Sequence, residues 1–314
     1  MKKRTRPRAA GAGRKESAAA KAEARRAYRS GAELADLVLR RRQSALAAAA
    51  GKPKLGLLIA EGDSWFDYPF CDVLEVLEGE GYEVESVAHR GDNLEDMAHD
   101  PGQVEGLTRA FEKVRRRGKT PRAILLSGGG NDIAGDEFAM LINHVNSGLP
   151  MLNATVADGL IRERLRTAMA SLVGVVTRLC ESHFAERARV VLHGYDYPIP
   201  DGRGWLGGTW FFPGPWLEPG FRRKGHFADK PQRKTSVLEA NACELRDLID
   251  RYNVMLSDLV SDLASGGLTH VRYVDLRGTL SAAVPSGYKA DWGNELHPTK
   301  PGFAKVAAKI AAAL

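Results

Sequence analysis

Apolar runs of strand length alternate with longer amphipathic segments along most of this chain, and this alternation restricts its fold more than any other feature. The apolar runs lie at residues 54–60, 82–88, 122–127, 188–193 and 270–275. Segments with helical spacing lie at residues 73–80, 103–117, 158–184, 237–264 and 301–313. Strands that alternate with helices build parallel sheets covered by helices on both faces. The sequence therefore predicts an α/β fold with a five-stranded parallel sheet.

The size and composition fit one large soluble α/β domain with appendages. The chain has 314 residues, of which 44% are hydrophobic and 27% charged, as in ordinary globular proteins. No apolar run approaches the roughly 20 residues that span a bilayer, and no apolar segment follows the basic start as in a signal peptide. Cys71, Cys180 and Cys243 lack metal-binding or Cys-x-x-Cys spacing. We expect free thiols in a reducing, cytoplasmic compartment.

The first residues differ in charge from the rest of the chain. Residues 1–30 contain eleven Lys or Arg and two Glu, a net charge of +9, whereas the whole chain carries +6 and residues 31–314 therefore carry −3. A basic, Ala-rich and Gly-rich start predicts a disordered arm, which is either a solvated tail or a weak contact for nucleic acid or an anionic surface. Residues 31–52 have helical spacing and good helix formers, and residues 53–314 would form the main domain.

Three segments far apart in the sequence carry the residues that could do chemistry. Ser64 follows the first apolar run, in Gly-Asp-Ser. Asn131 follows the third, in Gly-Gly-Gly-Asn-Asp, and His297 lies near the C-terminus in Asn-Glu-Leu-His-Pro. Open α/β sheets build their sites at the carboxyl ends of strands. A hydroxyl, a carboxamide and an imidazole are the groups of a nucleophile, an oxyanion donor and a general base.

These segments resemble the SGNH (GDSL-like) serine hydrolase superfamily from about Leu57 to Phe303. Ser64 matches its nucleophile block, Gly91 its lone-glycine block, Gly129 to Asp132 its Gly-x-Asn-Asp block and His297 its terminal histidine. The resemblance, with the right-handed crossover rule, implies a three-layer α/β/α, flavodoxin-like fold. It also implies an oxyanion hole formed by the backbone N–H groups of Ser64 and Gly91 and the side chain of Asn131.

The acid that would support His297 is the point at which this sequence departs from the family. The family has Asp three residues before its histidine, whereas this chain has Asn294. Asp291 could reach the ring if Gly293 lets the segment fold back, and it is our first choice. Asn294 could orient the ring without offering a charge, and Glu295 would share a face with His297 in an extended segment. A Ser-His dyad is the remaining alternative.

Residues 198–235 interrupt the alternation with an aromatic, Gly-rich and Pro-rich insertion, which predicts a lid or a pocket wall. The alternative is a hydrophobic cluster that only covers the sheet edge. Other side chains that follow strand ends are expected to line the pocket without taking part in chemistry, and Asp63 is expected to fix its loop as a turn carboxylate. The predicted pocket residues are Asp67, Asp132, Tyr195, Asp196, Trp205, Trp210 and Trp216.

The sequence thus predicts a serine-dependent hydrolase of acyl esters that needs no metal or cofactor, acting on a small-molecule, carbohydrate or lipid ester. A metallophosphoesterase is disfavoured because the chain lacks an upstream Asp-x-His and a His after the Asn, and no Gly-x-x-x-x-Gly-Lys loop is present. The alternative is a binding protein that kept the fold but lost turnover through Asn294, with the basic arm contacting nucleic acid.

Overall fold

The computed structural model describes residues 51–69, 71–135, 137–205 and 214–314, together with ten residues between 28 and 47. The chain divides into two units, residues 1–44 and residues 45–314. The ten described residues between 28 and 47 are helical and exposed. Almost all of the predicted basic arm lies outside the described residues, and the domain limits drawn from the sequence stay a prediction.

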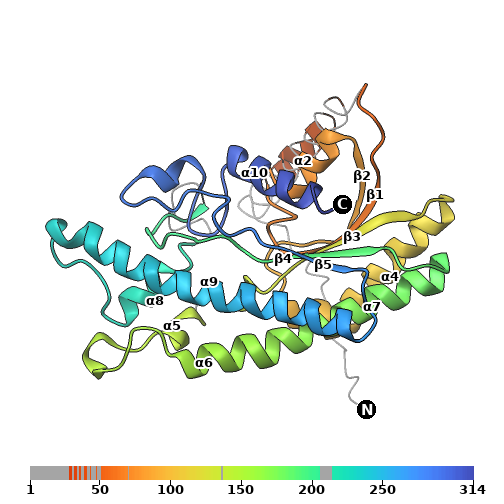
Figure 1. The fold of residues 1–314 in the computed structure, drawn as a ribbon. Helices are drawn as coiled ribbons and strands as arrows, with labels where there is room; N and C mark the ends of the chain where they lie inside the picture. The colour runs from red at the N-terminus through yellow and green to blue at the C-terminus, as the bar shows by residue number, and fades with distance from the viewer. Residues whose placement is uncertain are drawn as a thin grey trace, which may run out of the picture. The chain divides into compact units, whose positions relative to one another are not determined.

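The second unit contains one parallel sheet of five strands (Figure 1). The strand order is β2 (Tyr82–Ser86), β1 (Gly56–Gly62), β3 (Pro121–Ser127), β4 (Arg189–His193) and β5 (Val271–Val274). Every neighbouring pair is parallel. The chain passes from β2 on one side of β1 to β3 on the other, which makes the carboxyl ends of β1 and β3 the switch point of the sheet.

Helices cover both faces of this sheet (Figure 1). One face carries α2 (Val73–Glu80) and α10 (Lys300–Ala311), which pack against each other. The other face carries α3 (Leu94–His99), α4 (Pro101–Arg116), α7 (Arg166–Phe184) and α9 (Lys234–Ser265). The predicted three-layer α/β/α fold is therefore confirmed. The five predicted strands and four of the five predicted helices are found with small shifts of their ends, whereas the helix predicted over residues 158–184 is divided.

Local sequence signals fix where several of these helices begin. The carboxylate of Asp72 accepts a hydrogen bond from Glu75 N at 2.8 Å and caps α2, and Asp100 caps α4 just before a proline. Thr299 caps α10 in the same way, two residues after His297. An uncapped N-terminus leaves N–H groups without partners. The last cap therefore also fixes the direction in which the chain leaves the His297 loop.

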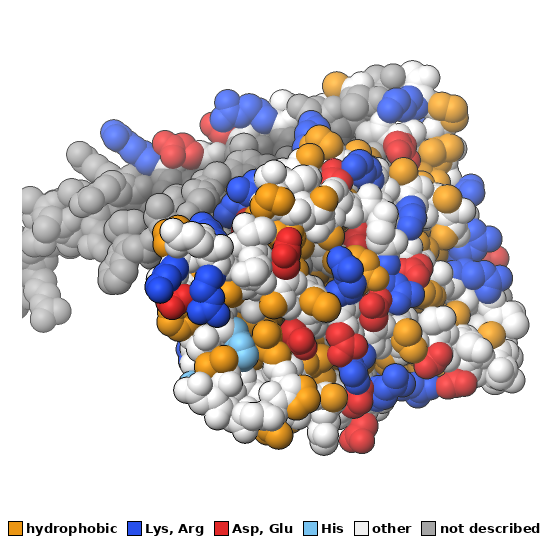
Figure 2. Space-filling model, turned by 60° about the vertical axis from the view of Figure 1, so that its left-hand side comes forward, with side chains coloured by type: hydrophobic (Ala, Val, Ile, Leu, Met, Phe, Trp, Pro, Cys, Tyr) orange, Lys and Arg blue, Asp and Glu red, His pale blue; other side chains and the backbone are white. Residues whose placement is uncertain are grey.

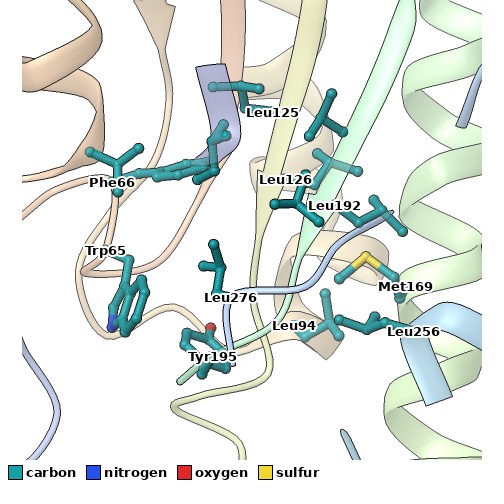
Figure 3. Close-up of a cluster of buried hydrophobic side chains, with 14 of the residues drawn as sticks. Trp65, Phe66, Leu94, Leu125, Leu126, Met169, Leu192, Tyr195, Leu256 and Leu276 are labelled. Carbon is teal, nitrogen blue, oxygen red and sulfur yellow. The ribbon is translucent and has the colours of Figure 1, made fainter. Parts of the chain in front are cut away.

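The central strands β1, β3 and β4 are largely buried because helices lie above and below them, and their side chains form one continuous core. Leu125 and Leu126 of β3, Leu192 of β4 and Leu256 of α9 are fully buried neighbours in Figure 3. Trp65 and Tyr195 extend this core to the carboxyl edge of the sheet, with ring centroids 5.1 Å apart. Each buried leucine contributes roughly 1.5–3 kcal/mol to folding through the apolar surface removed from water.

The remaining elements are short or interrupt the regular pattern. The segment predicted as one helix over residues 158–184 consists of α6 (Ala154–Asp158), a π-helix (Gly159–Leu165) and α7. The elements α5 (Phe138–Leu141) and α8 (Glu218–Arg223) pack together, and α8 lies within the insertion. Within the described residues no helix is both long and apolar enough to cross a membrane. Basic and acidic side chains are interspersed over the face seen in Figure 2.

One strand carries a charged group in an otherwise apolar interior. Glu61, at the end of β1, is 3% exposed. Its carboxyl accepts a hydrogen bond from Gly62 N at 3.0 Å, and no cation pairs with it among the described residues. Burial raises the pKa of Glu61 from 4.5 to about 8, and the nearby carboxylate of Asp92 adds to this effect. The folded protein therefore holds Glu61 as the neutral acid at neutral pH.

The titration of Glu61 predicts how stability depends on pH. Between pH 4.5 and about 8 the folded state keeps this proton and the unfolded state has lost it, so the free energy of unfolding falls as the pH rises, by about 1.4 kcal/mol per pH unit. Glu61→Gln removes this dependence. We expect the stability of Glu61→Gln relative to the unmodified protein to increase from pH 5 to pH 8.5, as measured by urea unfolding.

The matched control is Glu105→Gln, which alters an exposed carboxylate on α4. Its ion pair with Arg109 is exposed and contributes little to stability. Its stability difference from the unmodified protein should therefore vary far less with pH than that of Glu61→Gln. If the unfolding curves of Glu61→Gln and the unmodified protein change in parallel from pH 5 to pH 8.5, Glu61 does not hold a proton in the folded state.

Candidate active site

Ser64 and Asn131 lie at the switch point of the sheet, where the loops after β1 and β3 meet. Both line a cavity of about 60 Å³. The rest of this cavity is mostly apolar, with walls from the segment after β3, from Leu217 of the insertion and from α9, and its α9 residues are Leu245, Leu248, Ile249 and Tyr252. The topology therefore brings a hydroxyl and a carboxamide from two distant loops to one small pocket.

Asp63 holds this edge of the sheet together. Its carboxylate accepts hydrogen bonds from Trp65 N at 3.0 Å, from Ser127 Oγ at 2.9 Å and from the hydroxyl of Tyr195. Ser127 ends β3 and Tyr195 follows β4, so one buried carboxylate joins the ends of three strands. The structure thus gives Asp63 the turn-fixing role expected from the sequence, with two further partners from distant strands.

The hydroxyl of Ser64 contacts the imidazole of His297. The distance from Ser64 Oγ to His297 Nε2 is 2.8 Å, and His297 Nδ1 lies 3.0 Å from Asn294 Oδ1. The same oxygen also accepts hydrogen bonds from the backbone N–H groups of Leu296 and His297. These donors fix the carboxamide with its oxygen toward the ring, so Nδ1 carries the hydrogen and Nε2 is left to accept the proton of Ser64.

The surroundings of His297 favour its neutral form. The ring of Tyr68 stacks on the imidazole with centroids 4.2 Å apart, and Trp216 meets it edge-on at 5.5 Å. Burial lowers the pKa of His297 from 6.5 to about 3, because these rings and the neutral carboxamide of Asn294 offer no charge to stabilise an imidazolium. At neutral pH the imidazole is therefore free to take a proton.

Asp291, our first choice for the residue that supports His297, does not contact the ring, and this prediction is wrong. Its carboxylate binds Lys305 Nζ at 2.7 and 2.8 Å and Ser281 N at 2.8 Å. The reason is a tight turn between the bridged residues Trp292 and Pro298, in which Gly293 N donates to His297 O at 2.9 Å. This turn encloses Asn294 with His297 and leaves Asp291 outside.

Glu295 does not support the ring either, because it binds the insertion. This side chain is fully buried, and its carboxylate accepts four backbone N–H groups at 2.7 to 3.1 Å, from Gly202, Trp216, Leu217 and Glu218. Burial raises the pKa of Glu295 from 4.5 to about 7, although the four hydrogen bonds act in the opposite direction. Glu295 therefore fastens the insertion to the His297 loop and places Trp216 beside the imidazole.

Of the predicted oxyanion donors, Ser64 and Asn131 line the same cavity, Gly91 does not, and the side chain of Asn131 is already engaged. Asn131 Nδ2 donates a hydrogen bond to Asp92 O at 2.9 Å, which ties the loop after β3 to the loop that contains Gly91. One N–H of this carboxamide remains. Gly91 is exposed and has φ +91°, which is a backbone conformation that favours glycine. No acceptor is found among the described residues for the backbone N–H groups of Ser64 and Gly91.

The predicted pocket residues have different positions in the structure. Tyr195 and Asp196 line the cavity, but Asp196 binds the backbone N–H groups of Gly278 and Leu280. Neither Asp67 nor Asp132 lines it: Asp67 binds Arg90, next to Gly91, and Asp132 binds Leu94 N at the start of α3. These three carboxylates fix loops.

The predicted Trp residues of the insertion also differ in their positions. Trp216 contacts His297, whereas Trp205 does not line the cavity beside Ser64. Trp210 lies outside the described residues. Trp216 does not line this cavity either, so the expectation of a pocket wall holds, among the described residues of the insertion, for Pro198 and Leu217. The expectation of a lid stays a prediction.

Tyr68 is a site residue that sequence reasoning did not single out. It stacks on His297, and its hydroxyl accepts a hydrogen bond from Asn294 Nδ2 at 3.0 Å. Burial raises the pKa of Tyr68 to about 12, so it stays a neutral phenol. Its position four residues after Ser64, in the turn that ends β1, was the one available signal.

Comparison with known proteins supplies similarities of fold and no closer relationship. No family model and no curated protein matches the chain. Solved structures similar to it include an acetylxylan esterase from Geobacillus stearothermophilus, at 12% identity over 82% of this chain and 94% of that one, with a TM-score of 0.39. A family two carbohydrate esterase from Clostridium thermocellum matches at 11% identity over 83% and 64% of the two chains, with a TM-score of 0.41.

The esterase EstA from Pseudoalteromonas sp. is a third similar structure, at 10% identity over 82% of this chain and 95% of that one, with a TM-score of 0.36. Likenesses at such low identities and TM-scores do not assign an activity. The functional assignment therefore depends on the residues of the site.

Proposed function

We propose that this protein is a serine hydrolase of short-chain acyl esters, of the SGNH type that its sequence resembles. The observation that carries the proposal is the chain of contacts from Ser64 Oγ to His297 Nε2, 2.8 Å, and from His297 Nδ1 to Asn294 Oδ1, 3.0 Å. A serine hydroxyl attacks an ester only when a positioned base takes its proton. A neutral His297 in hydrogen-bond reach of Ser64 meets that requirement.

The proposed reaction proceeds through an acyl-enzyme. Ser64 Oγ attacks the acyl carbonyl while His297 Nε2 takes its proton, and the negative charge that develops on the carbonyl oxygen is stabilised by N–H donors from Ser64, Gly91 and Asn131. His297 then returns the proton to the leaving alcohol. Water, activated by the same imidazole, attacks the acyl carbon and releases the acid and free Ser64.

Asn294 is the feature that separates this site from a charged triad, and it favours a second candidate function. A carboxamide orients the ring but does not stabilise the imidazolium that forms during the attack. In serine proteases, the exchange of the triad Asp for Asn costs about 10⁴-fold in turnover. The alternative is therefore a binding protein that kept the fold and lost turnover. An activity assay distinguishes the two.

The first test is the hydrolysis of p-nitrophenyl acetate. We expect measurable turnover that falls at least about 10³-fold in Ser64→Ala, because the nucleophile is lost. The control is Ser265→Ala, an exposed serine at the end of α9, which should keep full activity. The absence of hydrolysis by the unmodified protein, with any acyl ester tested, would favour the binding protein.

The small cavity predicts which acyl groups are accepted. Its volume of about 60 Å³ is far below the roughly 300–1,000 Å³ of pockets for larger ligands. We expect kcat/KM for p-nitrophenyl acetate to exceed that for the octanoate at least tenfold. Leu248→Ala removes side-chain volume from the cavity wall and so enlarges the cavity. This variant should raise the rates with butyrate and hexanoate relative to the rate with acetate. Faster hydrolysis of the octanoate by the unmodified protein would contradict this view of the pocket.

The neutral Asn294 predicts the effect of restoring a carboxylate. In Asn294→Asp a negative charge stabilises the imidazolium, so the pKa of His297 should rise from about 3 toward 6.5 or above. The acidic side of the kcat/KM profile should shift to higher pH together with the pKa of His297. At pH 8, kcat should increase between about 10- and 10⁴-fold. A folded Asn294→Asp protein with an unchanged pH profile would show that His297 is not the base.

A further inference from the structure

A second and larger depression lies in the same unit, and we name it the distal groove. It has a volume of about 960 Å³ and shares no lining residue with the cavity beside Ser64. Its walls come from residues 200–203, from α8, from residues 226–231, from the start of α9 and from residues 285–289. Such a volume is in the range of pockets that bind small organic ligands.

The charges that line the distal groove leave three ammonium groups unpaired. Each of its carboxylates forms an ion pair with an arginine: Asp201 with Arg203, Glu218 with Arg222 and Asp229 with Arg233. Lys230, Lys234 and Lys289 are exposed, and none of them forms an ion pair within the described part of the chain. Unpaired lysines around a concave surface attract anions.

Two buried polar atoms at the distal groove have no hydrogen-bond partner within the described residues. Asn241 is 4% exposed, and its Nδ2 donates to His226 O at 3.1 Å while its Oδ1 has no donor. The guanidinium of Arg203 binds Trp292 O and Gly293 O through Nη1, and its Nη2 has no acceptor. Unsatisfied buried polar groups are costly and uncommon in folded proteins. Asn241 Oδ1 lacks a donor and Arg203 Nη2 lacks an acceptor. Hydroxyl groups of a ligand can supply both, because a hydroxyl donates and accepts hydrogen bonds.

Apolar and aromatic surface completes the lining. Phe227 is 43% exposed with the guanidinium of Arg222 over its ring. The guanidinium of Arg203 and the ammonium of Lys289 each lie over the ring of Tyr288, 5.4 and 5.8 Å from its centroid. The lysines come from two separate segments, residues 230–234 and 289. Charges spread over two walls fit several separate anionic groups better than one compact phosphate.

We propose that the distal groove binds an acidic oligosaccharide, with carboxylates at the lysines and hydroxyl groups at Asn241 and Arg203. Gly202 and Glu218, whose N–H groups bind Glu295, also line the groove. The groove is therefore connected to the His297 loop through that carboxylate. This binding does not depend on the chemistry at Ser64.

The test is calorimetric titration of the protein with trigalacturonate and, as a neutral match, cellotriose. We expect trigalacturonate to bind at least tenfold more tightly than cellotriose at low salt, and its affinity to fall as sodium chloride is added, because screening weakens charge attraction. No heat with trigalacturonate up to about 10 mM, an order-of-magnitude limit for weak sites, or equal affinities for the two sugars, would overturn the proposal.

Variants connect the binding to the groove. The double variant Lys230→Glu/Lys234→Glu and the single variant Lys289→Glu change exposed residues, so they should fold. Each should weaken trigalacturonate binding, the double variant at least tenfold. Lys54→Glu, the same exchange at an exposed lysine just before β1, should have no effect. An equal loss in Lys54→Glu would assign the binding to general surface charge and overturn the proposal.

Two further measurements complete the design. Asn241→Ala should weaken trigalacturonate binding several-fold. Unchanged affinity in this variant would contradict the proposed contact between Asn241 and a hydroxyl group of the sugar. Ser64→Ala should bind trigalacturonate as well as the unmodified protein does, and loss of binding there would place the sugar at Ser64 instead. Because binding is read without turnover, a failed esterase assay leaves this result intact, and the two proposals fail separately.

Discussion

The structure of the candidate site depends on the buried carboxylate of Asp63. It binds the backbone of the Ser64 turn, the hydroxyl of Ser127 at the end of β3 and the hydroxyl of Tyr195 after β4. A buried carboxylate is stable only when hydrogen bonds replace its hydration, and these three donors come from three strands. The requirement to satisfy Asp63 therefore fixes the strand ends against one another and holds Ser64 at the switch point.

A second buried carboxylate organises the other half of the site. Glu295 collects four backbone N–H groups from two segments of the insertion and lies two residues before His297. It thereby joins the insertion, which supplies Trp216, to the loop that supplies the imidazole. Glu61, by contrast, has a single backbone donor and a pKa raised to about 8. Burial raises the pKa of both groups, and the four hydrogen bonds of Glu295 hold its rise to about 7, below the value of about 8 for Glu61.

Among the described residues, the immediate surroundings of His297 contain aromatic rings and a carboxamide but no charge that contacts the ring. Tyr68, Trp216 and Asn294 orient the ring and exclude water, and they leave the imidazole neutral with a pKa near 3. Such a base is always available to receive a proton, but the imidazolium that it forms has little stabilisation. The proposed enzyme would therefore have a lower turnover than one with a charged triad, but its base would stay deprotonated at acidic pH.

The sequence by itself determined the fold class and the identity of the three chemical segments, because strand and helix periodicities are local and the polar residues follow strand ends. It also predicted that Ser64 and His297 belong to the same site, as nucleophile and general base. Only the tertiary structure decided which side chain supports the imidazole, since the turn from Trp292 to Pro298 depends on its backbone hydrogen bonds and on packing against the sheet. The roles of Glu295 and Tyr68 likewise follow from contacts between segments far apart in the chain, which no local pattern encodes.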